Sequence, residues 1–285
     1  KNSAFGVFAL ENNTTGAENV ALGKDSLGAN TTGPNNTAVG TNSLRRNTEG
    51  EDNTAVGNLA LCTNTTGDHN VAVGLSALHK NTTADNNVAV GTCASGCNTD
   101  GHSNVSIGFS ALCTNTTGDK NIAIGHQSLL SLATANEIVA IGYNSLRALT
   151  TGTDNTAVGF EAGKSITTGD RNTAMGYLAL STMTTVADNT AVGYKAMTAN
   201  TSGSNNTAVG KDAMLANTTG ANNVAIGQNA LETSTSGGAN TAVGQLAAQD
   251  LTTGAENTAI GHEAGNNITT GTNNTLLGHE AGTDA

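Results

Sequence analysis

Residues 206–222 read NTAVGKDAMLANTTGAN, and residues 223–239 read NVAIGQNALETSTSGGA, which is the same pattern displaced by 17 positions. If Asn206 is taken as position 1 of a unit, the alignment extends back to Asn2 and forward to Asn274 without an insertion or a deletion. Seventeen copies, the last one incomplete, therefore fill the 285-residue chain. A repeat of fixed period is typical of a stacked architecture, so each copy is interpreted as one coil.

Side-chain types are segregated by position within this unit. Position 1 is Asn in 16 of 17 copies, with Ile138 as the exception, and position 5 is always Gly. Position 3 is Ala except at Ser106 and Leu276, position 8 is Ala or Ser, and position 4 is always apolar. Beyond Lys1, every charged Lys, Arg, Asp or Glu falls at positions 6, 7, 10, 11, 14, 16 or 17. This division indicates that the same positions face inward in every coil.

The period and the alternation together predict the fold. Seventeen residues are too few for a helical-hairpin repeat. Positions 2 to 4 alternate β-branched, small and β-branched residues, which favours a strand. Glycine at position 5, and often at position 15, supplies corners where φ can be positive. We predict an all-β protein, a parallel β-solenoid of 17 coils stacked about 4.8 Å apart, with residues 1–285 as one continuous domain.

The Asn and Thr columns predict ladders between coils. Stacked Asn side chains at positions 1 and 12 can pass amide hydrogen bonds from one coil to the next. Position 12 becomes apolar in four consecutive middle copies, at Leu132, Leu149, Ile166 and Met183. Because a solvent-facing column would have no reason to exchange a polar ladder for an apolar one, position 12 is predicted to be internal.

Both faces of the predicted strand lack charge. Positions 2 and 4 point to one face and position 3, almost always Ala, points to the other. Strands buried on both faces read as nearly continuous apolar runs, and one thin coil buries few large side chains. We therefore expect identical chains to pack their Ala faces together in a closed ring.

Three segments carry a resemblance to a known family. Residues 223–227 (NVAIG), 121–125 (NIAIG) and 139–142 (VAIG) resemble the head repeat of YadA-like trimeric autotransporter adhesins. The array is also similar to stretches of phage and viral fibre proteins. The family's units are usually a few residues shorter, and the NTTG arm is a departure from them.

The resemblance implies a left-handed β-roll and a homotrimer of three parallel chains. It also implies an extracellular adhesive fibre on a cell or virion surface, with a host-surface glycan or an extracellular matrix protein as partner. Because the sequence starts at Lys1 without Met, it is expected to be a segment of a longer fibre protein.

Composition and motifs argue against several other functions. Aromatic residues make up 2% of the chain, Trp is absent and the net charge is −11, which disfavours nucleic acid as a partner. No apolar run approaches the roughly 18 residues of a membrane helix, so no membrane insertion by this segment is expected. No catalytic motif is present, and a repeat without insertions offers no obvious place for an enzyme pocket. We expect no catalytic residue, cofactor or metal.

The sharpest surface feature is an aromatic column at position 6, which carries five of the seven Phe and Tyr residues. Position 6 is polar in several other copies, at Lys24, Thr41, Asn58 and Lys211, so the column should face solvent. It can bind sugar rings or an apolar partner, or it can act as a self-stacking ladder that stabilises adjacent coils. The column consists of Phe109, His126, Tyr143, Phe160, Tyr177 and Tyr194.

The four cysteines leave their pairing open. Cys62 and Cys113 share position 10 three coils apart, beyond the roughly 7 Å limit on the Cα separation of a disulfide. Cys93 can pair with Cys97, or Cys97 with Cys113, or all four can remain free thiols.

Two further polar patterns have simple structural explanations. The pairs His262–Glu263 and His279–Glu280 stack in successive coils but are most simply a locally duplicated repeat. Asp52, Asp119 and Asp154 are scattered and do not form a calcium-binding repeat.

Ice binding is the hypothesis from another functional class, because Thr-rich solenoids can present flat hydroxyl arrays. Such a surface needs a Thr-x-Thr pair on one outward strand. Here Thr at position 2 is paired with Val or Ile at position 4, and the Thr residues of positions 13 and 14 are neighbours that point to opposite faces. The pattern therefore favours the fibre hypothesis.

Overall fold

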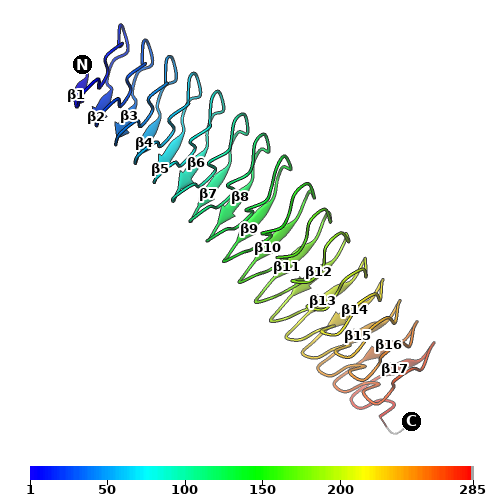
Figure 1. Ribbon diagram of the computed structural model, residues 1–285. Coiled ribbons are helices and arrows are strands. Elements are labelled where there is room, and N and C mark those ends of the chain that lie inside the picture. Colours follow the sequence, from blue (N-terminus) through cyan, green and yellow to red (C-terminus); the bar gives the residue numbers. More distant parts are fainter. Residues whose placement is uncertain (284–285) are drawn as a thin grey trace. The chain divides into compact units, whose positions relative to one another are not determined.

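The computed structural model describes residues 1–283 and shows an all-β parallel β-solenoid in which no described residue is helical. The chain divides into two compact units, Lys1–Ile141 and Gly142–Ala285. Within each unit, successive strands run side by side in the same direction, and each is followed by two turns that return the chain to the next strand (Figure 1).

Each strand is three residues long and occupies positions 2 to 4 of the repeat. In the first unit the strands are β1 (Ser3–Phe5), β2 (Val20–Leu22), β3 (Thr37–Val39), β4 (Thr54–Val56), β5 (Val71–Val73), β6 (Val88–Val90), β7 (Val105–Ile107), β8 (Ile122–Ile124) and β9 (Val139–Ile141). In the second unit they are β10 (Thr156–Val158), β11 (Thr173–Met175), β12 (Thr190–Val192), β13 (Thr207–Val209), β14 (Val224–Ile226), β15 (Thr241–Val243), β16 (Thr258–Ile260) and β17 (Thr275–Leu277).

The register confirms the 17-residue period. Ala38 of β3 pairs with Ala55 of β4 in the first unit, and Ala208 of β13 pairs with Ala225 of β14 in the second. Each strand residue thus stacks on its equivalent in the next coil of its unit, which is why the type of side chain repeats so strictly along the strand columns.

The Ala face of the strand lies inside the coil, which corrects the expectation that it forms an interface between chains. Ala38 and Ala208 are fully buried within a single chain, whereas the residues before and after them in β3 and β13 are partly exposed. Position 3 is small because the coil is thin and the Leu side chains of position 9 fill the space opposite the strand.

Both exceptions at position 3 show this packing directly. Ser106 Oγ accepts a 2.9 Å hydrogen bond from the hydroxyl of Ser95, which replaces Leu at position 9 of the preceding coil. Leu276, the large exception, faces Gly265 and Gly282 at position 9, and a Cβ on Gly282 would come within 2.6 Å of the Leu276 side chain. Positions 3 and 9 therefore share one internal volume.

The turns use left-handed backbone at residues that seldom adopt it. Positions 7, 9 and 17 have positive φ even when they are not Gly; Leu44, for example, is fully buried at φ 47°. Position 5 is Gly for two reasons: Gly40 has a φ of 130°, and a Cβ there would lie 2.6 Å from the carbonyl oxygen of Gly57. Position 15 does not have positive φ, contrary to our expectation, and its Gly is explained by close approach: a Cβ on Gly50 would lie 2.5 Å from Oδ1 of Asn47 in the same coil and 2.6 Å from the Gly67 carbonyl oxygen of the next.

The predicted Asn ladders are confirmed in both units. The backbone N–H of Asn53 donates to Oδ1 of Asn36 at 3.0 Å, and Nδ2 of Asn36 donates to the Gly50 carbonyl at 2.8 Å. At position 12, Nδ2 of Asn47 donates to Oδ1 of Asn30 at 2.9 Å. The amides thus satisfy backbone groups that would otherwise be buried without partners.

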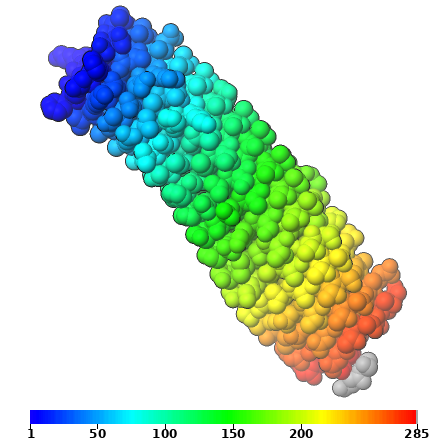
Figure 2. Space-filling model, viewed as in Figure 1, coloured from blue at the N-terminus to red at the C-terminus, as the bar shows by residue number. Residues whose placement is uncertain are grey.

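The apolar substitutions of position 12 are internal as predicted. Leu132 in the first unit and Leu149, Ile166 and Met183 in the second are fully buried. On the face shown in Figure 2, the described residues of each unit pack closely and leave no deep hollow.

Candidate functional site

The aromatic column forms a stack of rings in the second unit. Position 6 follows the corner Gly, so each ring projects from the end of a strand. Tyr143, Phe160, Tyr177 and Tyr194 stack in sequence, with ring centroids 5.2 Å apart at each step. The rings are 42–45% exposed, which confirms that position 6 faces solvent.

The first unit contains a shorter stack of the same kind. Phe109 and His126 lie 5.2 Å apart between centroids, with 17° between the ring planes. Phe109 is half exposed.

Ring geometry limits what the column can bind. Phe160 is nearly parallel to both Tyr143 and Tyr177, at 8° and 15°, so neighbouring rings cover both of its faces. At the end of the stack, Nζ of Lys195 lies 5.3 Å from the Tyr194 centroid. A sugar stacks on the face of an aromatic ring, whereas this column presents ring edges and hydroxyls. The geometry favours a stabilising ladder, and binding of an apolar partner along the edges stays a prediction.

The outward face of the sheet is a candidate interaction surface. The sequence predicted the Ala face for this role, and that prediction is wrong because the Ala side chains are buried. The outward face consists of the β-branched and apolar side chains of positions 2 and 4. Val20, Leu22 and Ile107 of the first unit are 38–45% exposed, as are Met175 and Ile226 of the second, at 41% each. The absence of charge at both positions in every coil was the signal for this surface.

Aspartates at position 16 have structural roles. Oδ1 of Asp68 accepts the backbone N–H of Glu51 at 2.8 Å, and Oδ1 of Asp85 accepts that of Asp68 at 2.8 Å. Asp119 accepts the backbone N–H of His102 in the same way, at 2.7 Å. These carboxylates connect coils as the Asn amides do.

The other candidate aspartates have local partners. Asp52 lies 3.6 Å from Nε2 of His69, and Asp154 accepts a hydrogen bond from the Thr153 hydroxyl at 3.1 Å. Residues 1–283 contain no group of three or more His, Cys, Asp and Glu side chains arranged to hold a metal ion.

The histidines near the C-terminal end form a small stack. The rings of His262 and His279 lie 5.1 Å apart, and each histidine is within 3.6 Å of the glutamate that follows it. This arrangement fits a duplicated surface repeat.

All four cysteines are free thiols, and three lie close to one another. The backbone N–H of Cys97 donates to the Cys113 carbonyl at 3.0 Å, so these two residues are neighbours on adjacent coils. Burial raises the pKa of the Cys113 thiol, and the nearby Cys97 and Cys93 raise it further. Burial also raises the pKa of Cys62, against the opposing effect of Arg45 and Arg46.

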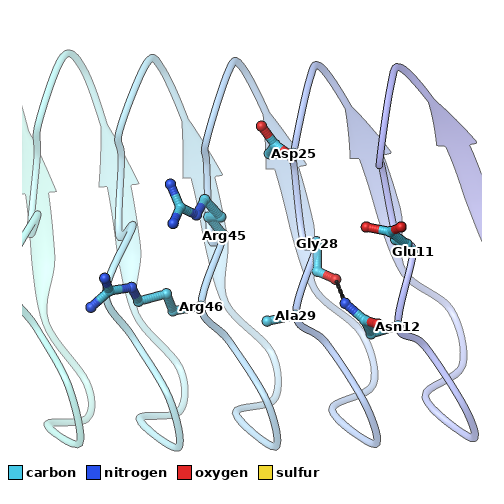
Figure 3. A pocket seen from close by; sticks show the side chains of 7 residues that line it. All are labelled: Glu11, Asn12, Asp25, Gly28, Ala29, Arg45 and Arg46. Carbon is cyan, nitrogen blue, oxygen red and sulfur yellow. Dashed lines mark hydrogen bonds between the residues drawn. The ribbon is translucent and has the colours of Figure 1, made fainter.

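A shallow pocket of about 250 Å³ lies on the first unit where position 10 is Gly. Gly28 and Ala29 form its floor, with Glu11 on the preceding coil and Arg45 and Arg46 on the following one (Figure 3). Asn12 donates to the Gly28 carbonyl at 2.7 Å across this floor. Both guanidinium groups point away from the floor, toward the next coil.

Comparison of the chain with protein-family models gives no match, and comparison with curated proteins gives no significant relative. None of the described residues belongs to a helix long and apolar enough to cross a lipid bilayer.

Proposed function

We propose that this chain is a structural and adhesive segment of an extracellular homotrimeric fibre with left-handed coils, displayed on a cell or virion surface. The observation that carries the proposal is the outward sheet face, which is uncharged in every coil and only partly buried in one chain. An extended exposed apolar surface of this kind is typical of an interaction site.

Self-association is the simplest way to cover that face. Because the same residue types recur every 17 residues, a second copy laid alongside presents matching columns, apolar at position 4 and mostly Thr or Val at position 2. Three such chains can turn their outward faces toward a common axis. This arrangement replaces the Ala-mediated ring that the sequence suggested, since the Ala methyl groups are already buried.

Continuous hydrogen bonding within each unit supports a spacer role. Backbone, Asn and Thr groups all bond to the next coil, as in the 3.1 Å bond from the Thr48 hydroxyl to the Thr65 carbonyl. A stack without inserted loops separates its two ends by a constant rise per coil, which suits the shaft or head of a bacterial adhesin. A phage or virus tail-fibre shaft is the alternative within the same class.

One structural observation favours ice binding. Thr156, Thr173, Thr190 and Thr207 form an unbroken, partly exposed column on the outward face of the second unit. Position 4 beside them is apolar, so a Thr-x-Thr array is missing. Thermal hysteresis of the monomer at millimolar concentration would support this alternative over the fibre.

The native mass of the chain tests the proposal. We expect light scattering across a concentration series to give about three times 28.3 kDa. Lysines placed on the outward face, in the double variant Val192→Lys/Val209→Lys, should shift the mass toward the monomer. The control Thr168→Lys/Thr185→Lys adds the same charge at exposed residues of position 14 and should stay trimeric. A wild-type chain that is monomeric at every concentration would contradict the proposal.

A further inference from the structure

Six of the 11 Lys and Arg side chains of this acidic protein have a carboxylate or aromatic partner. Lys24, Lys120, Lys164, Arg171 and Lys211 each have a carboxylate partner within 3.9 Å, and Lys195 lies over the Tyr194 ring. The other five have no carboxylate of residues 1–283 within ion-pair distance, namely Lys1, Arg45, Arg46, Lys80 and Arg147, and of these Arg45, Arg46 and Lys80 lie close together along the chain. Three of the 11 Lys and Arg residues are thus unpaired in one short stretch of the first unit.

These three residues lie on the same corner of the solenoid. Arg45 and Arg46 occupy positions 10 and 11 of one coil, and Lys80 occupies position 11 two coils later, about 10 Å along the stack. His79 lies beside Lys80 and its Nδ1 is 3.4 Å from the Leu59 carbonyl. We name Arg45, Arg46, His79 and Lys80 the cation patch.

The coil in the middle of the cation patch has the buried Cys62 and the partly exposed Thr63 at these positions, and neither is a carboxylate. Figure 3 shows both guanidinium groups turned toward that coil. The two guanidinium groups act electrostatically on this coil, because Arg45 and Arg46 lower the pKa of the Cys62 thiol against the larger effect of burial. A negative group placed over this coil is therefore favoured by Arg45 and Arg46, and Lys80 on the following coil extends the positive charge along the stack.

We infer that the cation patch binds the sulfate or carboxylate groups of a linear anionic polysaccharide. Arginine matches such groups well, because its planar guanidinium can donate two parallel hydrogen bonds to two oxygens of one anion. Like charges held together without a protein partner are unfavourable, and an external anion removes that cost. The inference deepens the adhesive function proposed above by naming a class of partner.

The carboxylates around the cation patch favour a sparsely charged polysaccharide over nucleic acid as the ligand. Glu11 and Asp25 border the adjacent pocket, and Glu49 lies on the same coil as Arg45. Duplex DNA carries a charge about every 1.7 Å along its axis, so it would bring phosphates over these carboxylates. A polysaccharide with one or two charges per sugar pair can engage the cation patch and avoid them.

Titration calorimetry with a chondroitin sulfate decasaccharide, at about 0.15 M salt, tests the inference on the full chain. The triple variant Arg45→Ser/Arg46→Ser/Lys80→Ser should weaken binding about tenfold or more. The matched control Lys120→Ser/Arg171→Ser/Lys211→Ser removes the same charge from paired, exposed sites and should bind as the wild type does. Equal weakening of both variants, or no wild-type binding, would overturn the inference.

Two competition experiments distinguish binding of a polysaccharide from binding of a single small anion. An uncharged dextran of equal length should not compete, and inorganic sulfate should compete only at far higher concentration than the decasaccharide. Equal competition by sulfate at the same sulfate concentration would overturn the polysaccharide assignment, because it would indicate a site for one small anion. Self-association is measured without any glycan, so failure of the fibre proposal and failure of this inference are distinguishable.

Discussion

The hydroxyls of Ser95 and Ser106 form a 2.9 Å hydrogen bond in the core of the first unit. Ser95 replaces the usual Leu of position 9, and Ser106 replaces the usual Ala of position 3 on the next coil. Both side chains are buried; the Ser95 hydroxyl donates to the Ser106 oxygen, and the Ser106 hydroxyl donates to the Val88 carbonyl at 3.3 Å. The pair shows that the strand's small residues and the Leu column face each other inside the coil.

A double-mutant cycle on this pair should show strong coupling. Ser106→Ala alone leaves a buried hydroxyl with no strong partner and should cost about 1 kcal/mol. Ser95→Leu/Ser106→Ala restores the pattern of the other coils and should stabilise the chain by about 1 kcal/mol, because it buries an additional apolar side chain. Denaturant unfolding of the four variants measures both values, and additive effects would argue against the shared volume.

Two glycines of one coil should respond differently to Ala. Gly40 combines positive φ with close approach, so Gly40→Ala should destabilise the chain by about 3 kcal/mol or more. Gly50 also meets the next coil at 2.6 Å, but Ala84 and Ala135 occupy the same repeat position elsewhere, so Gly50→Ala should cost about 1 kcal/mol. Similar losses in thermal unfolding would show that φ is unimportant at position 5.

The aromatic stack should contribute to stability more than to binding. Phe160→Ser removes the ring between Tyr143 and Tyr177 and should cost about 1 kcal/mol, whereas Phe160→Tyr should be neutral. Hydrogen exchange of the amides around β10 and β11 would report the loss locally. Unchanged exchange in Phe160→Ser, together with lost partner binding, would instead establish the stack as a recognition surface.

Thiol reactivity should follow burial. Burial raises the pKa values of Cys62 and Cys113, so less of each thiol is ionised near pH 8. Cys62 is also only 5% exposed. Iodoacetamide labelling followed by peptide mapping should therefore modify Cys93 and Cys97 first and Cys62 last. Fastest labelling at Cys62 would mean that this coil opens readily.

Asp188 should remain ionised at unusually low pH. The Arg171 guanidinium donates two hydrogen bonds to its carboxylate, at 2.7 and 3.0 Å, and so lowers the Asp188 pKa. The small stabilisation from this pair is present above the unfolded pKa and disappears as the pH falls through the folded one. An NMR titration of the carboxyl should show the lowered value, and Arg171→Ser should return it to the ordinary range. Identical titrations in both proteins would exclude the ion pair in solution.

Much of the fold could be predicted because every coil repeats the same constraints. Asn36 and Asn53 are equivalent in sequence and adjacent in space, so a column of identical amides implies a ladder. The aromatic stack followed from the same rule, since Tyr143 and Phe160 share a position. The cation patch could not be read in this way, because the pairing of charges depends on side-chain directions between columns.

The sequence by itself determined the period, the parallel register and the columns that avoid charge. It did not determine which face of the strand is inside, because alternation defines two faces and neither carries charge. Only the tertiary structure decided this: turns with left-handed backbone at residues such as Leu44 direct the Leu column across the coil and leave room opposite it for a methyl group. At both exceptions to Ala at position 3, the residue at position 9 changes as well: Ser106 faces Ser95, and Leu276 faces Gly282. These paired changes are visible in the sequence, but only the structure shows that the two positions are in contact.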